Sequence, residues 1–243
     1  MTGKLDIGEM ENLLGFLGYG ESSAPIWFIG MEEGIAGQKD CGDFEWNVAA
    51  RCTFTATMDL NDAHLNMRIS GSPIDIQDVK KFRRLPQPWL WMARIVGAHF
   101  GTFDWQDTEE VKRCVREKLG RKGGHTFLTE LSPLPRRNLG DRRWTKLLDI
   151  NEPIAKSLIS RRKQKLKTLF EANNPRLVVC YGLSKKSQFQ DLLGVGSLPT
   201  VYEAVERSED GRVLILPFFG NGRFRRSLGE SMIQDGLFGT APT

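Results

Sequence analysis

The sequence predicts an α/β protein with three layers, α/β/α, around a central four-stranded, mainly parallel sheet. Four short apolar runs are bounded by turn residues, as buried strands are, at residues 26–30, 125–130, 177–182 and 213–217. Helical segments separate these runs, and strands that alternate with helices form parallel sheets covered on both faces. We therefore expect a single domain over residues 1–243, with a long loop insertion at about residues 31–75.

Composition narrows the class of protein. Hydrophobic residues make up 40% of the chain, and no apolar run approaches the ~18 residues of a membrane span. The N-terminus lacks a signal-peptide pattern, and the four cysteines include no Cys-x-x-Cys pair. We therefore predict a cytoplasmic protein with no membrane partner. His64, His99 and His125 have no acidic or cysteine partners at ligand spacing, so we predict no metal and no cofactor.

Charge is distributed unevenly along the chain. Residues 1–75 carry 4 Lys and Arg against 12 Asp and Glu, whereas the remainder carries 30 against 18. A basic C-terminal two-thirds beside an acidic first third is typical of a polyanion-binding surface around a carboxylate site. Solvated helix faces are the alternative explanation.

Local signals predict the helices in order. A short helix and a glycine turn cover residues 5–20. Pro86 and Pro88 interrupt a helical segment that begins near Ile76, because proline removes a backbone donor and clashes with the preceding turn. Further helices follow at about residues 107–120, 151–172 and 184–193, with a last one after the fourth strand.

The helix at 151–172 is the longest and has two faces. Its apolar face includes Leu158 and Leu166. We assign its basic residues to the other face, namely Arg161, Arg162, Lys163, Lys165 and Lys167.

Polar residues follow the predicted strand ends. Glu32 and Glu33 stand in a glycine-bounded turn after the first strand, Glu130 ends the second, and residues 221–226 follow the fourth. Ligands bind beyond the carboxyl ends of parallel strands, so these groups should meet in one crevice. For the two glutamates, a solvated acidic turn is the alternative.

This order of motifs resembles the uracil-DNA glycosylase superfamily over roughly residues 24–228. In that superfamily a glycine-rich turn after the first strand bears the residue that activates water. The turn Gly30-Met31-Glu32-Glu33-Gly34 places Glu32 at that position, with Glu33 where proline usually stands. Some branches carry the acid one position earlier, where this chain has Met31, so the choice between Glu32 and Glu33 stays open.

The resemblance implies three further site residues. In some branches the aromatic residue that stacks on the flipped base follows the first glycine by 14 positions, which here is Phe44. Packing of Phe44 or Trp46 on the core is the alternative. Glu130 takes the place of the polar residue, usually asparagine, that reads the base edge. After the fourth strand the family has a histidine-containing loop, whereas this chain has Asn221 and no histidine.

The chemistry of N-glycosidic cleavage requires such groups. Positive charge develops on the sugar, and a carboxylate such as Glu32 can stabilise it and orient water. Asn221, or backbone N–H groups of its loop, would donate hydrogen bonds to the departing base. Apart from Lys39 nearby in sequence, no lysine stands in these motifs as a Schiff-base nucleophile. The resemblance therefore implies a monofunctional glycosylase rather than a lyase.

DNA is the expected partner, and no obligate protein partner is evident. A base inside a duplex must be flipped out before it can react. Phe224 would wedge into the gap in the stack, with a loop anchor as the alternative role. Three arginines would hold phosphates: Arg223, Arg225 and Arg226.

Glu130 indicates which base is bound. An ionised glutamate only accepts hydrogen bonds, so it would repel O4 of uracil and accept from the exocyclic amine of a cytosine-like base. The predicted function is removal of a modified, cytosine-like base to leave an abasic site, in DNA repair or in restriction of foreign modified DNA as an antiviral defence. Capping of the next turn, or pairing with Arg136 or Arg137, is the alternative role of Glu130.

Two other functions are left open by the sequence. A catalytically silent DNA-binding module on the same fold would explain the missing histidine. A small-molecule enzyme on a Rossmann-like sheet is the third reading, but no Gly-x-Gly-x-x-Gly motif follows the first strand.

Overall fold

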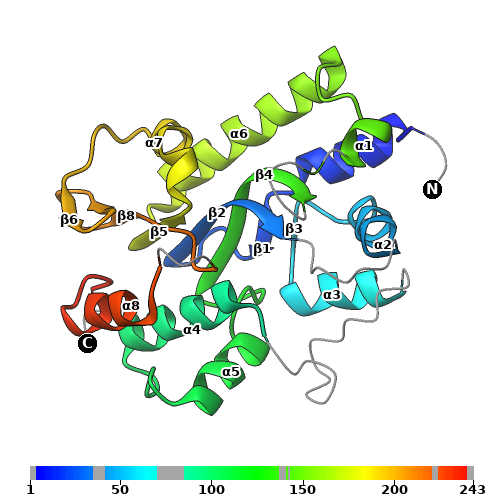
Figure 1. Cartoon of the computed structure of the whole chain (residues 1–243). Helices are drawn as coiled ribbons and strands as arrows, with labels where there is room; N and C mark the ends of the chain where they lie inside the picture. The colour runs from blue at the N-terminus through cyan, green and yellow to red at the C-terminus, as the bar shows by residue number, and fades with distance from the viewer. Residues whose placement is uncertain are drawn as a thin grey trace.

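The structure is a computed structural model that describes residues 4–34, 42–69, 85–136, 141, 143–220 and 224–239. Its centre is an eight-stranded, mostly parallel sheet with the strand order β3-β1-β4-β2-β5-β8-β7-β6 (Figure 1). The strands are β1 (Gly18–Gly20), β2 (Ile26–Gly34), β3 (Thr57–Met58), β4 (Thr126–Arg136), β5 (Leu177–Tyr181), β6 (Thr200–Tyr202), β7 (Val205–Arg207) and β8 (Val213–Leu216). The predicted α/β class is confirmed.

The predicted four-stranded sheet is wrong. The four predicted strands form the parallel centre, β4-β2-β5-β8, and four short strands extend it. Strands β1 and β3 lie at one edge, and the antiparallel hairpin of β6 and β7 lies at the other. Strands of two or three residues are too short to show a period of two in sequence, which is why the prediction missed them.

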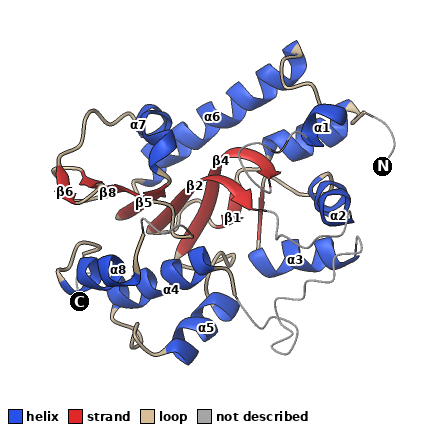
Figure 2. Cartoon of the chain, viewed as in Figure 1, coloured by secondary structure: helices blue, strands red, loops and turns tan. Residues whose placement is uncertain are grey.

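Helices cover both faces of the sheet (Figure 2). One face carries α4 (Gln87–Phe100), α5 (Thr108–Glu117) and α8 (Arg226–Gln234). The other carries α6 (Pro153–Asn173) and α7 (Lys186–Leu193). The remaining helical elements are α1 (Ile7–Gly15), α2 (Gly42–Arg51), α3 (Leu60–Ile69), η1 (Arg143–Lys146) and η2 (Leu183–Lys185). Of the helices in the described ranges, none is both long enough and apolar enough to cross a membrane.

Strand β2 shows how the two cores form. Successive side chains of a strand point to opposite faces. Phe28 packs among residues of α4 and α5, whereas Trp27 and Ile29 pack with Leu166 and Phe170 of α6. Trp27, Phe28 and Ile29 are all fully buried, as expected of a central strand that is covered on both sides.

The strand ends differ from the prediction. Strand β2 continues through the predicted acidic turn to Gly34, and β4 continues to Arg136. The two strands pair in parallel, and Glu32 lies opposite Ser132 before an irregularity between Glu32 and Gly34. The acidic pair therefore belongs to an extended strand, because the neighbouring strand supplies backbone partners that local sequence does not reveal.

The stretch predicted as a loop, residues 31–75, contains regular structure. Helices α2 and α3 and the short strand β3 lie within it. Its apolar side chains are buried: Phe54, Leu60 and Ala63 pack in the cluster that contains Tyr19 of β1, and Val48 packs in a second cluster with residues of α1. Interspersed glycines and polar residues hid this helical pattern in the sequence.

Candidate functional site

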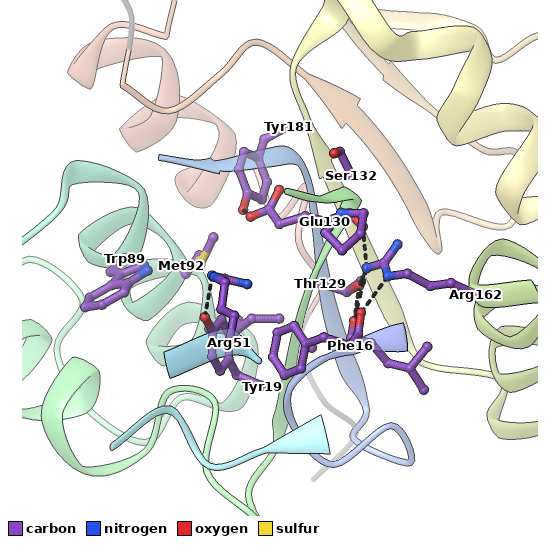
Figure 3. A pocket seen from close by; sticks show the side chains of 14 residues that line it. Phe16, Tyr19, Arg51, Trp89, Met92, Thr129, Glu130, Ser132, Arg162 and Tyr181 are labelled. Carbon is purple, nitrogen blue, oxygen red and sulfur yellow. Dashed lines mark hydrogen bonds between the residues drawn. The ribbon is translucent and has the colours of Figure 1, made fainter. Parts of the chain in front are cut away.

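A pocket lies beside residues 128–133 of β4, toward the carboxyl end of that strand, between it, the start of α4 and the edge of the sheet. It is lined by side chains from six elements, and Figure 3 shows ten of them by name. The cavity is small, about 40 Å³, enough for a few water molecules. Its wall combines aromatic rings with three charged groups, namely Glu130, Arg51 and Arg162. A cavity of this kind, at the carboxyl edge of parallel strands, is where an α/β protein binds its ligand.

Glu130 and Tyr181 meet across the strand that separates them. Both residues pair in register with Gly30 of β2, one on each side. The Tyr181 hydroxyl donates a hydrogen bond of 2.8 Å to Glu130 Oε1. A Cβ atom at Gly30 would lie 1.9 Å from Glu130 Oε2 and 2.5 Å from the Tyr181 hydroxyl oxygen. The absence of a side chain at Gly30 therefore makes room for the contact between the two outer strands.

Arg162 of α6 lies behind the Glu130 stretch and is fully buried. Its guanidinium donates hydrogen bonds to five acceptors: the carbonyl oxygens of Phe16 (2.5 Å), Leu17 (3.5 Å), Glu130 (2.8 Å) and Leu131 (3.2 Å), and Thr129 Oγ1 (3.4 Å). Burial lowers the pKa of Arg162 to about 10, and the charge of Glu130 acts in the opposite direction. Arg162 thus fixes residues 129–131 of β4 and places a positive charge near Glu130.

The assignment of Arg162 to a solvated basic face was wrong. Its side chain is 4% exposed, whereas those of the flanking Arg161 and Lys163 are exposed. Residues four apart on a helix share a face, and Arg162 stands four positions from both Leu158 and Leu166. That spacing was the available signal, and the charge of the side chain masked it.

Arg51 of α2 forms part of the wall opposite Glu130 (Figure 3). It is 1% exposed. Its Nε donates to Asn47 Oδ1 at 2.6 Å, and its Nη2 donates to the Tyr19 hydroxyl at 3.0 Å. The guanidinium also lies 5.6 Å from the ring centroids of Phe16 and Phe54. Sequence reasoning missed Arg51 and Tyr19, since neither stands at the end of a long strand.

Glu32 lies next to the pocket rather than in its lining. Its register partner on β4, Ser132, does line the pocket. Glu32 Oε2 is 3.4 Å from Nε of Arg136, and the glutamate side chain is 14% exposed. Burial raises the pKa of Glu32 above its usual value, and the positive charges of Arg136 and Lys185 offset part of this effect. Arg136 is therefore the ion-pair partner of Glu32.

Some of the other predicted site residues lie outside the described part of the chain, whereas Phe224 lies within it. Asn221 and Arg223 lie outside the described residues, as do the side chains of Phe44 and Glu33. Phe224 is 5% exposed and packs edge-on against Trp91 and Phe219, with ring centroids 5.1 Å and 4.9 Å away. In this position Phe224 is a core contact, which matches the alternative role of loop anchor.

Arg225 and Arg226 stand at the start of α8 and are exposed. Arg226 Nε lies 2.6 Å from Glu230 Oε1, one helical turn away. Within the described residues, no group of three or more His, Cys, Asp or Glu side chains is arranged to hold a metal ion.

No protein-family model matches the chain, and no curated protein matches it significantly.

Proposed function

We propose that the protein is a monofunctional DNA glycosylase that removes a modified, cytosine-like base. The observation that supports this most is the carboxylate of Glu130, held by Tyr181 in a pocket at the carboxyl end of the parallel strands. A carboxylate in this position accepts hydrogen bonds from an exocyclic amine and repels a carbonyl oxygen. The positive charge of the buried Arg162 lies near this carboxylate and attracts it.

The rest of the pocket suits a flat heterocycle. Trp89 and Tyr181 supply aromatic surface, and Tyr19 adds a hydroxyl. Enzymes that act on a base extrude it from the duplex and stack it between such side chains. The cavity of about 40 Å³ is smaller than a base ring, so side chains of the wall must move when the base enters. Rotamer changes of this size are common on binding.

Glu32 is the proposed catalytic carboxylate. Its partner in register lines the pocket, so Glu32 lies at the edge where the sugar of a flipped nucleotide would follow its base. An ionised carboxylate there stabilises the developing positive charge on the sugar and orients the attacking water. The water oxygen bonds to the sugar carbon as the glycosidic bond breaks. The bonding electrons leave with the base, which takes up a proton.

The reaction is tested with duplexes that carry single modified cytosines, followed by alkali cleavage of abasic sites. Wild type should cleave at a modified base. Glu32→Gln should lower the rate by about 10²–10⁴-fold, the range for a residue that acts on a proton in the transition state. Glu209→Gln, which changes an exposed carboxylate on the β7–β8 hairpin, is the matched control and should keep the rate. Equal rates in both variants would exclude Glu32 from catalysis.

Base choice is tested at Glu130. Glu130→Asn replaces an acceptor with a side chain that both donates and accepts. We expect the preference to move from amine-bearing bases toward those with a carbonyl at the same position. An unchanged order of substrates in this variant would contradict the role proposed for Glu130.

The ion pair of Glu32 with Arg136 favours a second candidate, a DNA-binding module without catalysis. A carboxylate engaged by an arginine is less available to orient water. In that case wild type and Glu32→Gln would both bind DNA, and neither would produce abasic sites from any modified or natural duplex.

A further inference from the structure

We propose that the amino end of β4 carries a second binding site, for a small organic anion with an apolar body. A cavity of about 400 Å³ lies there, between the last turns of α4 and α5 and the turn that leads into β4. This volume falls in the range of about 300–1,000 Å³ that is typical of small-molecule sites. The site is independent of the proposed glycosylase function.

The floor of this cavity is apolar. Val96 of α4, Cys114 of α5 and Leu119 are buried in it, and the half-buried ring of Phe100 stands beside them. Burial raises the pKa of the Cys114 thiol to about 11, so the thiol stays neutral near pH 7. An apolar ligand body would therefore be surrounded by uncharged groups and would gain the free energy of leaving water.

The rim is basic. Lys118, Lys122 and His125 line it and are exposed, and Glu117 is the acidic side chain among the lining residues. Within the described part of the chain, neither lysine belongs to an ion pair, whereas the nearby Arg121 is bound to Asp59 at 2.9 Å. The two lysines thus remain available to a negative group at the mouth. The His125 ring lies 5.1 Å from that of Phe100, which adds aromatic surface.

These features together select the chemistry of the ligand. A carboxylate or sulfonate would meet the lysines at the rim, and an aromatic or aliphatic body would fill the floor. A neutral body would lose the charge contacts, and a small inorganic anion would leave the apolar floor hydrated. We therefore expect an aryl or alkyl carboxylate rather than either of these.

Calorimetric titration of the full chain with 2-naphthoate tests the proposal, and neutral 2-naphthalenemethanol serves as the matched probe. We expect saturable binding of naphthoate, with a Kd of about 1 mM or lower, and binding of the alcohol at least about tenfold weaker. Failure of naphthoate to bind, or equal binding of the alcohol, would overturn the proposal.

Substitutions of lining residues test whether naphthoate binds in this cavity. The double charge reversal Lys118→Glu with Lys122→Glu should weaken naphthoate binding at least about tenfold. Thr102→Trp, a change at an exposed lining residue, should obstruct the mouth and abolish binding. Lys165→Glu, on the exposed face of α6, is the control and should bind as wild type does. All four residues are exposed, so the melting temperatures should stay close to wild type. Wild-type affinity in both rim variants would refute this location.

Discussion

The two ends of β4 differ in how they enclose space. At the carboxyl end, buried Arg51 and Arg162 and half-buried Glu130 surround a cavity of about 40 Å³. At the amino end, apolar side chains form the floor of a cavity of about 400 Å³ whose charges stand at the solvent-exposed rim. Both cavities touch α4, through Trp89 and Met92 in the first and through Val96 and Phe100 in the second.

This difference has an energetic reason. Burying a charged group costs several kcal/mol unless hydrogen bonds or an opposite charge compensate it. The carboxyl end therefore requires many partners in fixed positions, as the five acceptors of Arg162 illustrate. At the amino end, Lys118 and Lys122 stay hydrated and therefore need no such partners. Substitutions should accordingly be costly at the first end and tolerated at the second.

The largest expected effect is at Arg162. Arg162→Met removes the buried charge and leaves backbone carbonyls and Glu130 without this partner. We expect the free energy of unfolding to fall by about 3–5 kcal/mol, as when one partner of a buried pair is removed. Urea denaturation measures this loss. Arg161→Met, one position away and exposed, should change stability by less than about 0.5 kcal/mol. Similar losses in both variants would show that the burial of Arg162 is not decisive.

Removal of the Tyr181 hydroxyl comes next. Tyr181→Phe keeps the ring, which stacks on Phe219 at a centroid distance of 5.1 Å, and deletes the hydrogen bond to Glu130. A hydrogen bond to a charged group contributes about 1.5–3 kcal/mol, so stability should fall within that range. If Glu130 reads the base, the variant should also lose preference among modified bases. If neither the stability nor the preference among modified bases changes, Tyr181 does not contribute to the site.

Gly30 can be compared with a second glycine of the same strand. Gly30→Ala inserts a Cβ against Glu130 and Tyr181, whereas a Cβ at Gly34 meets nothing within 4 Å. We expect Gly30→Ala to cost about 1–3 kcal/mol, as overpacking does, and Gly34→Ala to cost much less. Thermal melting of both variants provides the measurement. A tolerated alanine at Gly30 would mean that the two outer strands do not meet as closely as described.

The pH dependence of activity reports on Glu32. Burial raises the pKa of this carboxyl, and catalysis needs its ionised form. Activity should therefore decline as pH falls through a pKa above the ordinary glutamate value, about tenfold per pH unit. Because the pKa is raised in the folded state, protonation of Glu32 favours folding. Acid unfolding driven by this group thus cannot explain the decline, and circular dichroism at each pH checks that the chain stays folded.

The smallest effect is expected at the amino end. Thr102→Ala changes an exposed residue at the mouth of the larger cavity, so stability should stay within about 0.5 kcal/mol of wild type. Urea denaturation in the same buffer as for Arg162→Met makes the comparison direct. A loss comparable to that of Arg162→Met would remove the contrast between the two ends.

The four strands at the centre of the sheet could be predicted from the sequence, but the ends of β2 and β4 could not. Apolar runs of four to eight residues with flanking turns carry this information locally, so the strand that contains Glu130 was predicted, although β4 continues past Glu130 to Arg136. Glu32 was identified as well, although it lies in a continuing strand rather than in a turn. The helix 151–172 was also predicted within two residues of α6.

Which of these residues meet depends on the packing of distant segments. Glu130 and Tyr181 are 51 positions apart, and their contact depends on β2 lying between β4 and β5 with a glycine in register. Arg162 is a basic residue like its solvated neighbours in the sequence. It is buried because carbonyl oxygens of β4 accept hydrogen bonds from it. Periodicity records which side of an element is apolar, but strand order and register are set by packing between distant segments.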